Sequence, residues 1–184
     1  MQTCASDENL MQLVAQGDLD AFGQLVLRHQ QMAWRTAYRL VADYQAAEDI
    51  AQDAFLRILD HADCYQPTAA FRSYLYRIVV RRCLDYLRKG RPIPTNDLGR
   101  GIEDTSLSSS PEQQVAHDEL TQAVQDALAR IPASHRTAIV LRYFEGLSGR
   151  EIADVMETTV KAVERLLARG RASLERLLSG FLDE

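Results

Sequence analysis

The stretch LSGREIADVMETTVKAVERLLAR, residues 147–169, decides how the second half of this chain folds. Ser148 is a favourable helix N-cap, and Glu151, three residues later, completes a capping box. A short turn at residues 157–159 separates a first helix from a second. The residues expected to face inward are Ile152, Ala153, Met156, Val160, Val163 and Leu167. This spacing predicts a helix-turn-helix, whose second helix lies in the major groove of DNA.

The outward face of that second helix carries the residues expected to contact DNA. Lys161 and Arg165 are placed for contact with bases, because a guanidinium can bond a guanine edge bidentately. Arg169 and Arg171 lie further along and are expected to hold phosphates. The alternative is a helical hairpin that serves only as core. The capping box, the small Ala153 where the helices cross and the basic outer face together favour DNA binding.

The net charge of the whole chain argues against DNA binding, but its distribution along the chain does not. A net charge of −5 over 184 residues, with a pI near 5.4, argues against a nucleic-acid partner. Residues 43–63, however, contain six acids and one base, whereas residues 72–89 contain six bases and one acid. Residues 1–90, 91–110 and 111–184 carry net charges of −1, −1 and −3, so no lobe is basic overall. We therefore expect basic helices in an acidic protein, and weak DNA binding by the chain alone.

Helical periodicity along almost the whole sequence predicts an all-α protein. Apolar residues recur three and four apart, whereas strand-like alternation and Asn-Gly or Asp-Gly turns are missing. One or two opening helices are expected up to residue 26, with Asp18 or Asp20 as an N-cap, and a further run covers residues 32–41. The later helices are expected over residues 46–61, 70–89, 112–131, 134–144, 149–156 and 159–178.

A change of composition divides the chain. Residues 90–111 contain three of the five prolines, with several Gly and Ser, and their apolar residues show no periodicity. The sequence therefore predicts two small helical domains, residues 1–90 and 112–184, joined by an extended, flexible linker, residues 91–111. The C-terminal domain contains the helix-turn-helix.

The basic run of the N-terminal domain is interleaved with aromatic residues. The stretch from residue 64 to residue 89 contains Tyr65, Phe71, Tyr74, Tyr76 and Tyr86 among its six bases. Aromatic residues at helical spacing are usually core, and Phe71 is expected to be partly so. Aromatic rings beside arginines are also what a protein needs to hold unstacked bases of single-stranded DNA.

Several classes of protein are excluded by the same sequence. No stretch approaches the roughly 18 apolar residues of a membrane helix, and the first ten residues do not resemble a signal peptide, so we expect a cytoplasmic protein. Cys4, Cys64 and Cys83 lack a CxxC spacing and are expected to be reduced thiols. His61 and Cys64 are too few ligands for a metal site. No cofactor is expected.

Four blocks of sequence, in order, resemble the sigma-70 superfamily of bacterial RNA polymerase initiation factors, in its small two-domain extracytoplasmic-function group. The blocks are AQGDLDAFGQLVLRH (15–29), AEDIAQDAFLRIL (47–59), FRSYLYRIVVRRCLDYLR (71–88) and LARIPASHRTAIVLRYFEGLSGREIADVM (128–156). The resemblance implies a sigma factor without catalytic activity, which binds core RNA polymerase and directs transcription from particular promoters. Such factors are commonly controlled by an anti-sigma protein, which can hold them at the membrane.

The resemblance also implies a role for each surface. The polymerase largest-subunit clamp helices would dock on the acidic helix, through Glu48, Asp49, Gln52, Asp53 and Phe55. The minus-ten promoter element would be melted and read by Tyr65, Phe71, Arg72, Tyr74, Arg77, Arg81 and Arg82. The linker acids Asp97, Glu103 and Asp104 would mimic nascent RNA. The C-terminal lobe would bind the polymerase flap and, through Lys161, Arg165, Arg169 and Arg171, the minus-thirty-five element.

Three single positions and one triplet depart from the family pattern. Tyr74 stands where Trp is usual, Arg81 where Asn is frequent, and Glu157 where the turn commonly has Gly. The usual basic-Ser-Arg triplet of the recognition helix appears as residues 164–166, Glu-Arg-Leu. An acid facing the groove can accept a hydrogen bond from cytosine, so we expect an unusual minus-thirty-five sequence.

Two other functions remain open on the residues alone. One is a helix-turn-helix repressor or activator with a helical regulatory lobe, which needs neither the acidic helix nor the aromatic-rich basic helix. The other is an enzyme that uses Glu48, Asp49 and Asp53. The sequence contains neither the E-x-x-H motif of di-metal bundles nor a Gly-rich phosphate loop, so these acids are better interpreted as a docking face.

Overall fold

The computed structural model describes residues 5–66, 70–89 and 111–182, with side chains in the last range described for residues 120–179. These residues form eight α-helices and two short helical segments, with no β-strand among them, which confirms the all-α prediction. The elements are α1 (Asp7–Ala15), α2 (Leu19–Val41), α3 (Tyr44–Asp60), η1 (Ala62–Cys64), α4 (Phe71–Arg88), α5 (Pro111–Arg130), α6 (Ala133–Ile139), η2 (Val140–Phe144), α7 (Gly149–Val155) and α8 (Val160–Leu182).

Helices α1 to α4 form the first lobe, with local caps at three of their starts. Ser6, Asp18 and Asp43 each accept a hydrogen bond from a backbone N–H three residues on, as N-caps do. The predicted division between an opening helix and a run at 32–41 is wrong, because α2 is continuous from Leu19 to Val41. No Pro interrupts that segment, and the chain turns instead at Gly17 and Ala42, which both have positive φ.

Helices α5 to α8 form the second lobe. Helix α5 begins at Pro111, which the sequence placed in the linker; a proline is tolerated in the first turn because its missing N–H has no partner there. The rest of the predicted linker lies outside the described residues. The helix expected over 134–144 is α6 followed by the π-helical η2. The capping box of Ser148 and Glu151 is present, and α7 and α8 make the predicted helix-turn-helix.

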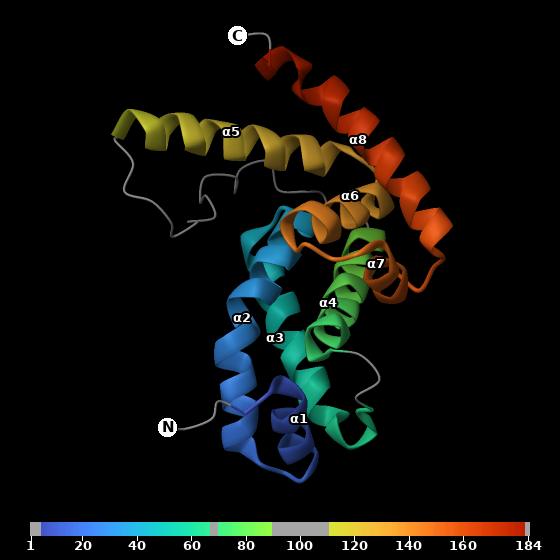
Figure 1. Ribbon diagram of the computed structural model, residues 1–184. Coiled ribbons are helices and arrows are strands. Elements are labelled where there is room, and N and C mark those ends of the chain that lie inside the picture. Colours follow the sequence, from blue (N-terminus) through green and yellow to red (C-terminus); the bar gives the residue numbers. More distant parts are fainter. Residues whose placement is uncertain (1–4, 67–69, 90–110, 183–184) are drawn as a thin grey trace.

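The two lobes pack against each other, which the sequence did not predict. Figure 1 shows α6 lying across the ends of α2 and α4, with α7 beside α4. One cluster of buried apolar side chains runs through both lobes, from Leu40 and Val80 to Leu128 and Leu141. Helices far apart in the sequence therefore share a core.

A buried arginine makes hydrogen bonds to both lobes where they meet. Arg136 of α6 is 3% exposed, and its guanidinium donates to the backbone carbonyls of Leu40 in the first lobe and of Ala129 and Ile131 in the second. Gln125 of α5 donates to the carbonyl of Tyr38, at 3.0 Å. Buried charges and amides are expensive unless they are hydrogen-bonded, so these bonds specify how the lobes meet.

The thiols, metal sites and membrane spans considered in the sequence analysis can be checked in the described residues. Cys64 is an exposed thiol and Cys83 a buried one, and burial raises the pKa of Cys83. No group of three or more His, Cys, Asp or Glu side chains in the described part of the chain is arranged to hold a metal ion. None of the described helices has both the length and the apolar composition that a membrane span requires.

Candidate nucleic-acid interface

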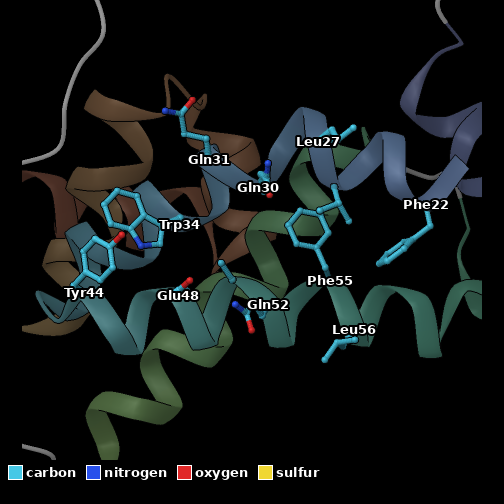
Figure 2. A pocket seen from close by; sticks show the side chains of 12 residues that line it. Phe22, Leu27, Gln30, Gln31, Trp34, Tyr44, Glu48, Gln52, Phe55 and Leu56 are labelled. Carbon is cyan, nitrogen blue, oxygen red and sulfur yellow. The ribbon is translucent and has the colours of Figure 1, made fainter. Parts of the chain in front are cut away.

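A groove with a volume of about 750 Å³ runs between α2 and α3. Figure 2 shows Phe22 and Trp34 of α2 and Phe55 of α3 between the two helices, with Leu27 and Leu56 at the outer edges. The full lining is Phe22, Val26, Leu27, Gln30, Gln31, Trp34, Tyr44, Glu48, Ala51, Gln52, Phe55 and Leu56. Leu27 and Leu56 are 73% and 57% exposed, which leaves an apolar surface at the edge of the groove.

The five residues predicted to dock a protein partner divide between this groove and its margin. Glu48, Gln52 and Phe55 line it, although Phe55 is only 5% exposed and contributes mostly to the core. Asp49 is exposed outside the groove, and its carboxylate accepts a long, 3.5 Å bond from Gln45.

The fifth of these residues, Asp53, is already engaged within the protein. Its carboxylate pairs with Arg57 at 2.9 Å and with Arg82 at 2.6 Å. Arg82 is one of the residues assigned to DNA, so a predicted protein contact and a predicted DNA contact hold each other. Partly exposed ion pairs of this kind contribute little to stability, about 0–1 kcal/mol, so a partner can exchange them.

Sequence reasoning missed Leu27, Trp34 and Leu56 as parts of this surface. Trp34 stacks on Tyr38 with ring centroids 5.3 Å apart and meets the edge of Tyr44 at 5.2 Å. The available signal was the pair of leucines, which lie off the buried stripes of their helices. A leucine off the buried stripe is common in surface helices, so the sequence alone did not distinguish it from an ordinary exposed residue.

The basic helix α4 presents only some of its predicted DNA contacts. Arg72, Arg77 and Arg81 are exposed. Phe71 is completely buried, and its ring lies 5.2 Å from that of His29. Phe71, the first residue of α4, therefore lies against α1 and α2 and is a core residue in this conformation. It exposes no surface through which it could contact DNA.

Two tyrosines lie together just before and within α4. The rings of Tyr65 and Tyr74 are 5.3 Å apart, and burial raises the pKa of both hydroxyls. The Tyr65 hydroxyl is buried without a hydrogen-bond partner among the described residues. This half-buried aromatic pair adjoins the loop at residues 63–70, of which residues 67–69 lie outside the described part of the chain.

The helix-turn-helix presents its predicted basic face to solvent. Lys161, Arg165, Arg169 and Arg171 are all exposed along α8. Val163 is completely buried, as expected, whereas Val160, expected to face inward, is 40% exposed. Val160 is the first residue of α8 and lies at the turn, with one methyl group beside Gly149 of α7 and part of its side chain open to solvent.

A search against protein families finds two matches in this chain. The model described as Sigma-70 region 2 matches residues 25–93, which include α4 and every residue that lines the groove except Phe22. The model described as Sigma-70, region 4 matches residues 121–174, which include the helix-turn-helix.

Curated relatives match over nearly the whole length. The RNA polymerase sigma-H factor of Pseudomonas aeruginosa is 33% identical over 100% of both chains. The ECF RNA polymerase sigma factor SigW of Bacillus subtilis is 32% identical, over 90% of this chain and 92% of its own.

Solved structures give the same likeness in three dimensions. CnrH, in complex with the cytosolic domain of CnrY, superposes with a TM-score of 0.70 at 27% identity, over 96% of this chain and 99% of that one. The sigma factor RpoE of Bartonella quintana, solved with the anti-sigma factor NepR, shares the fold with a TM-score of 0.66 at 22% identity, over 86% and 96%.

Proposed function

This chain belongs to the sigma-70 family, in its extracytoplasmic-function group, and from that premise we propose how its surfaces bind RNA polymerase and promoter DNA. The two family matches lie in the order region 2 and region 4, and each contains one of the basic helices. That arrangement carries the proposal. A sigma factor directs initiation without catalysing it, and we infer that this chain has no catalytic activity and acts in the cytoplasm.

The α2–α3 groove is the polymerase-docking surface in this proposal. Its exposed leucines supply apolar contact area, while Glu48, Asp49 and Gln52 supply charge and hydrogen bonds to basic groups on the polymerase clamp. Apolar contact area combined with polar groups is the usual composition of a protein interface. Asp53 pairs with Arg57 and Arg82, so in this proposal it contacts the polymerase only once Arg82 binds DNA instead.

Promoter recognition divides between the lobes. Helix α8 places Lys161 and Arg165 toward base edges of the minus-thirty-five element, with Arg169 and Arg171 on phosphates. Helix α4 brings Arg72, Arg77, Arg81 and Arg82 to the minus-ten element, beside the Tyr65–Tyr74 pair. Aromatic faces next to arginines suit unstacked bases. By likeness to CnrH, which is solved with CnrY, we propose that an anti-sigma protein controls the chain.

A binding and transcription experiment tests the docking surface. We expect purified chain to bind core RNA polymerase and to support transcription from a promoter library. Leu27→Asp combined with Leu56→Asp should weaken polymerase binding at least about tenfold, because the variant places two charges in the apolar contact area of the proposed interface, and a lost hot-spot contact costs about 2 kcal/mol or more. Both leucines are exposed, so the helix content should stay unchanged.

The control is Leu19→Asp on the same helix, at a leucine that is 66% exposed and lies outside the groove. It adds the same kind of charge and should leave polymerase binding unaltered. Failure of the wild-type chain to bind core polymerase would refute the proposed function. Equal effects of Leu19→Asp and the groove variants would refute the docking surface alone.

A further inference from the structure

A glutamate of the second lobe enters a polar site made by the first. Glu145 follows η2, and its side chain is 7% exposed. One carboxylate oxygen, Oε2, accepts a hydrogen bond from the Tyr76 hydroxyl at 2.5 Å; the other, Oε1, accepts one from the Thr36 hydroxyl at 2.9 Å. Thr36 belongs to α2 and Tyr76 to α4, so the carboxylate bridges two helices of the other lobe.

Two arginines complete the surroundings of this carboxylate. Arg39 Nη1 lies 3.5 Å from Oε1, and Arg72 Nη2 lies 3.8 Å from Oε2. Arg72 also donates to the backbone carbonyl of Glu145 at 3.0 Å and to the Tyr76 hydroxyl at 2.8 Å. Figure 1 shows the chain between α6 and α7 approaching α2 and α4, the helices that supply these four donors.

The four first-lobe side chains form an anion site. Two hydroxyls donate hydrogen bonds to one buried carboxylate, and two guanidiniums lie within 4 Å of it; a hydrogen bond to an ionised acceptor is stronger than one between neutral groups. The bonds offset the large cost of burying a charge. Burial and, after it, the nearby Glu145 raise the pKa of Tyr76.

A phosphate of nucleic acid requires the same donors as this carboxylate. Arginines and hydroxyls are the usual side chains on phosphate oxygens. Arg72 also lies at the start of α4, the helix that the proposed function gives to the minus-ten element, five residues before Arg77. A DNA strand following α4 therefore passes the site that Glu145 fills.

We propose that Thr36, Arg39, Arg72 and Tyr76 form a binding site for a backbone phosphate of promoter DNA, and that Glu145 occupies this site in the closed conformation seen here. The inference rests on the proposed function. It implies that the second lobe competes with single-stranded DNA for α4. Separation of the lobes on polymerase then removes the competing carboxylate.

The first experiment removes the charge of the occupant. Glu145→Gln in the full-length chain should raise its affinity for a fluorescein-labelled, mixed-sequence single-stranded DNA by about fivefold to tenfold, because the binding-competent fraction increases. Its radius of gyration from small-angle X-ray scattering should increase as the lobes separate. Glu175→Gln removes the same charge from an exposed position of the same lobe and should change neither quantity.

A second variant makes the test independent of how Glu145→Gln folds. Tyr76→Phe keeps the buried ring and removes only the hydroxyl that contacts Oε2. It should also increase the radius of gyration. If neither Glu145→Gln nor Tyr76→Phe enlarges the particle, Glu145 does not hold the lobes together, and the proposal is wrong.

The second experiment asks whether DNA phosphate takes the vacated site. Log affinity falls as log salt concentration rises. Adding Arg39→Gln to Glu145→Gln should make this dependence shallower by about 0.7, the value for one single-strand phosphate contact. Adding Arg130→Gln, at an exposed arginine of α5, should lower it by less. An equal slope with and without Arg39 would overturn the phosphate site.

A measurement with inorganic phosphate distinguishes a site for a small free anion from a site for DNA. If it raises the melting temperature of Glu145→Gln but not of the double variant with Arg39→Gln, while the DNA salt slope is the same in both, the site takes small anions and the DNA assignment is wrong. Transcription by the wild-type chain with core polymerase is a separate readout. Its success alongside unchanged Glu145→Gln behaviour would reject this inference and leave the proposed function standing.

Discussion

Helices α4 and α8 are both basic, yet the fold treats their charges differently. In α4, Arg72 reaches Glu145 and Arg82 pairs with Asp53. In α8, Lys161, Arg165 and Arg169 are exposed, and none of them forms an ion pair within the described part of the chain. In the proposed function, α8 can therefore meet DNA as it stands, whereas part of α4 has to exchange protein acids for phosphates.

The starts of the same two helices differ in the same way. Thr159 precedes α8, and its hydroxyl accepts from the backbone N–H of Ala162 at 3.2 Å, which is a local cap. Ala70 precedes α4 and has no capping side chain. Glu8 of α1 supplies the missing acceptor, at 3.2 Å from the backbone N of Phe71. The start of α8 is thus stabilised by its own sequence, and that of α4 by a distant segment.

The largest effect is expected from breaking the junction that places α4 against the second lobe. Arg136→Ala removes the donor to three backbone carbonyls, and should lower the free energy of unfolding by about 3 kcal/mol, since hydrogen bonds from a buried charge are worth about 1.5–3 kcal/mol. Urea unfolding measures it. Arg130→Ala, at an exposed arginine, should change stability by less than about 0.5 kcal/mol. Similar losses in both variants would show that Arg136 has no special role.

A smaller effect is expected from the exposed face of α8. Arg165→Ala should weaken promoter binding by the polymerase complex about tenfold, since a bidentate base contact contributes about 1–3 kcal/mol of discrimination. The loss should depend on the minus-thirty-five sequence. Arg176→Ala, further along the same helix, is the comparison and should cost less on every promoter. A loss at Arg165 that is uniform across promoters would make it a phosphate contact instead.

The smallest effect concerns the pH dependence of the start of α4. The Glu8 carboxylate accepts hydrogen bonds from the backbone N–H of Glu8 and from that of Phe71, and these bonds lower the pKa of Glu8 below its ordinary value of 4.5. The stabilisation is therefore present above that value and is lost as the pH falls through the folded-state pKa. Glu8→Gln should reduce stability slightly near neutral pH, and the gap from wild type should close in acid. Urea unfolding at several pH values measures the gap; a constant gap would contradict the assignment.

Local signals account for what could be predicted of the fold and of the DNA-binding face. The capping box at Ser148 and the N-cap at Asp18 are present because each depends on residues three apart in the chain. The exposure of Lys161 and Arg165 follows from the helical period of α8. The burial of Phe71 against the ring of His29 depends instead on a distant segment, which no local pattern specifies.

The sequence by itself determined the all-helical character, the cap at Asp18, the capping box at Ser148, the helix-turn-helix and the separation of charge between basic and acidic helices. Periodicity and capping act over a few residues, so they can be recognised along the chain. Tertiary structure alone decided that Glu145 lies among Thr36, Arg39, Arg72 and Tyr76, and that two leucines border a groove. Those contacts join residues up to 109 positions apart, and no local pattern specifies which distant donors a buried carboxylate will find.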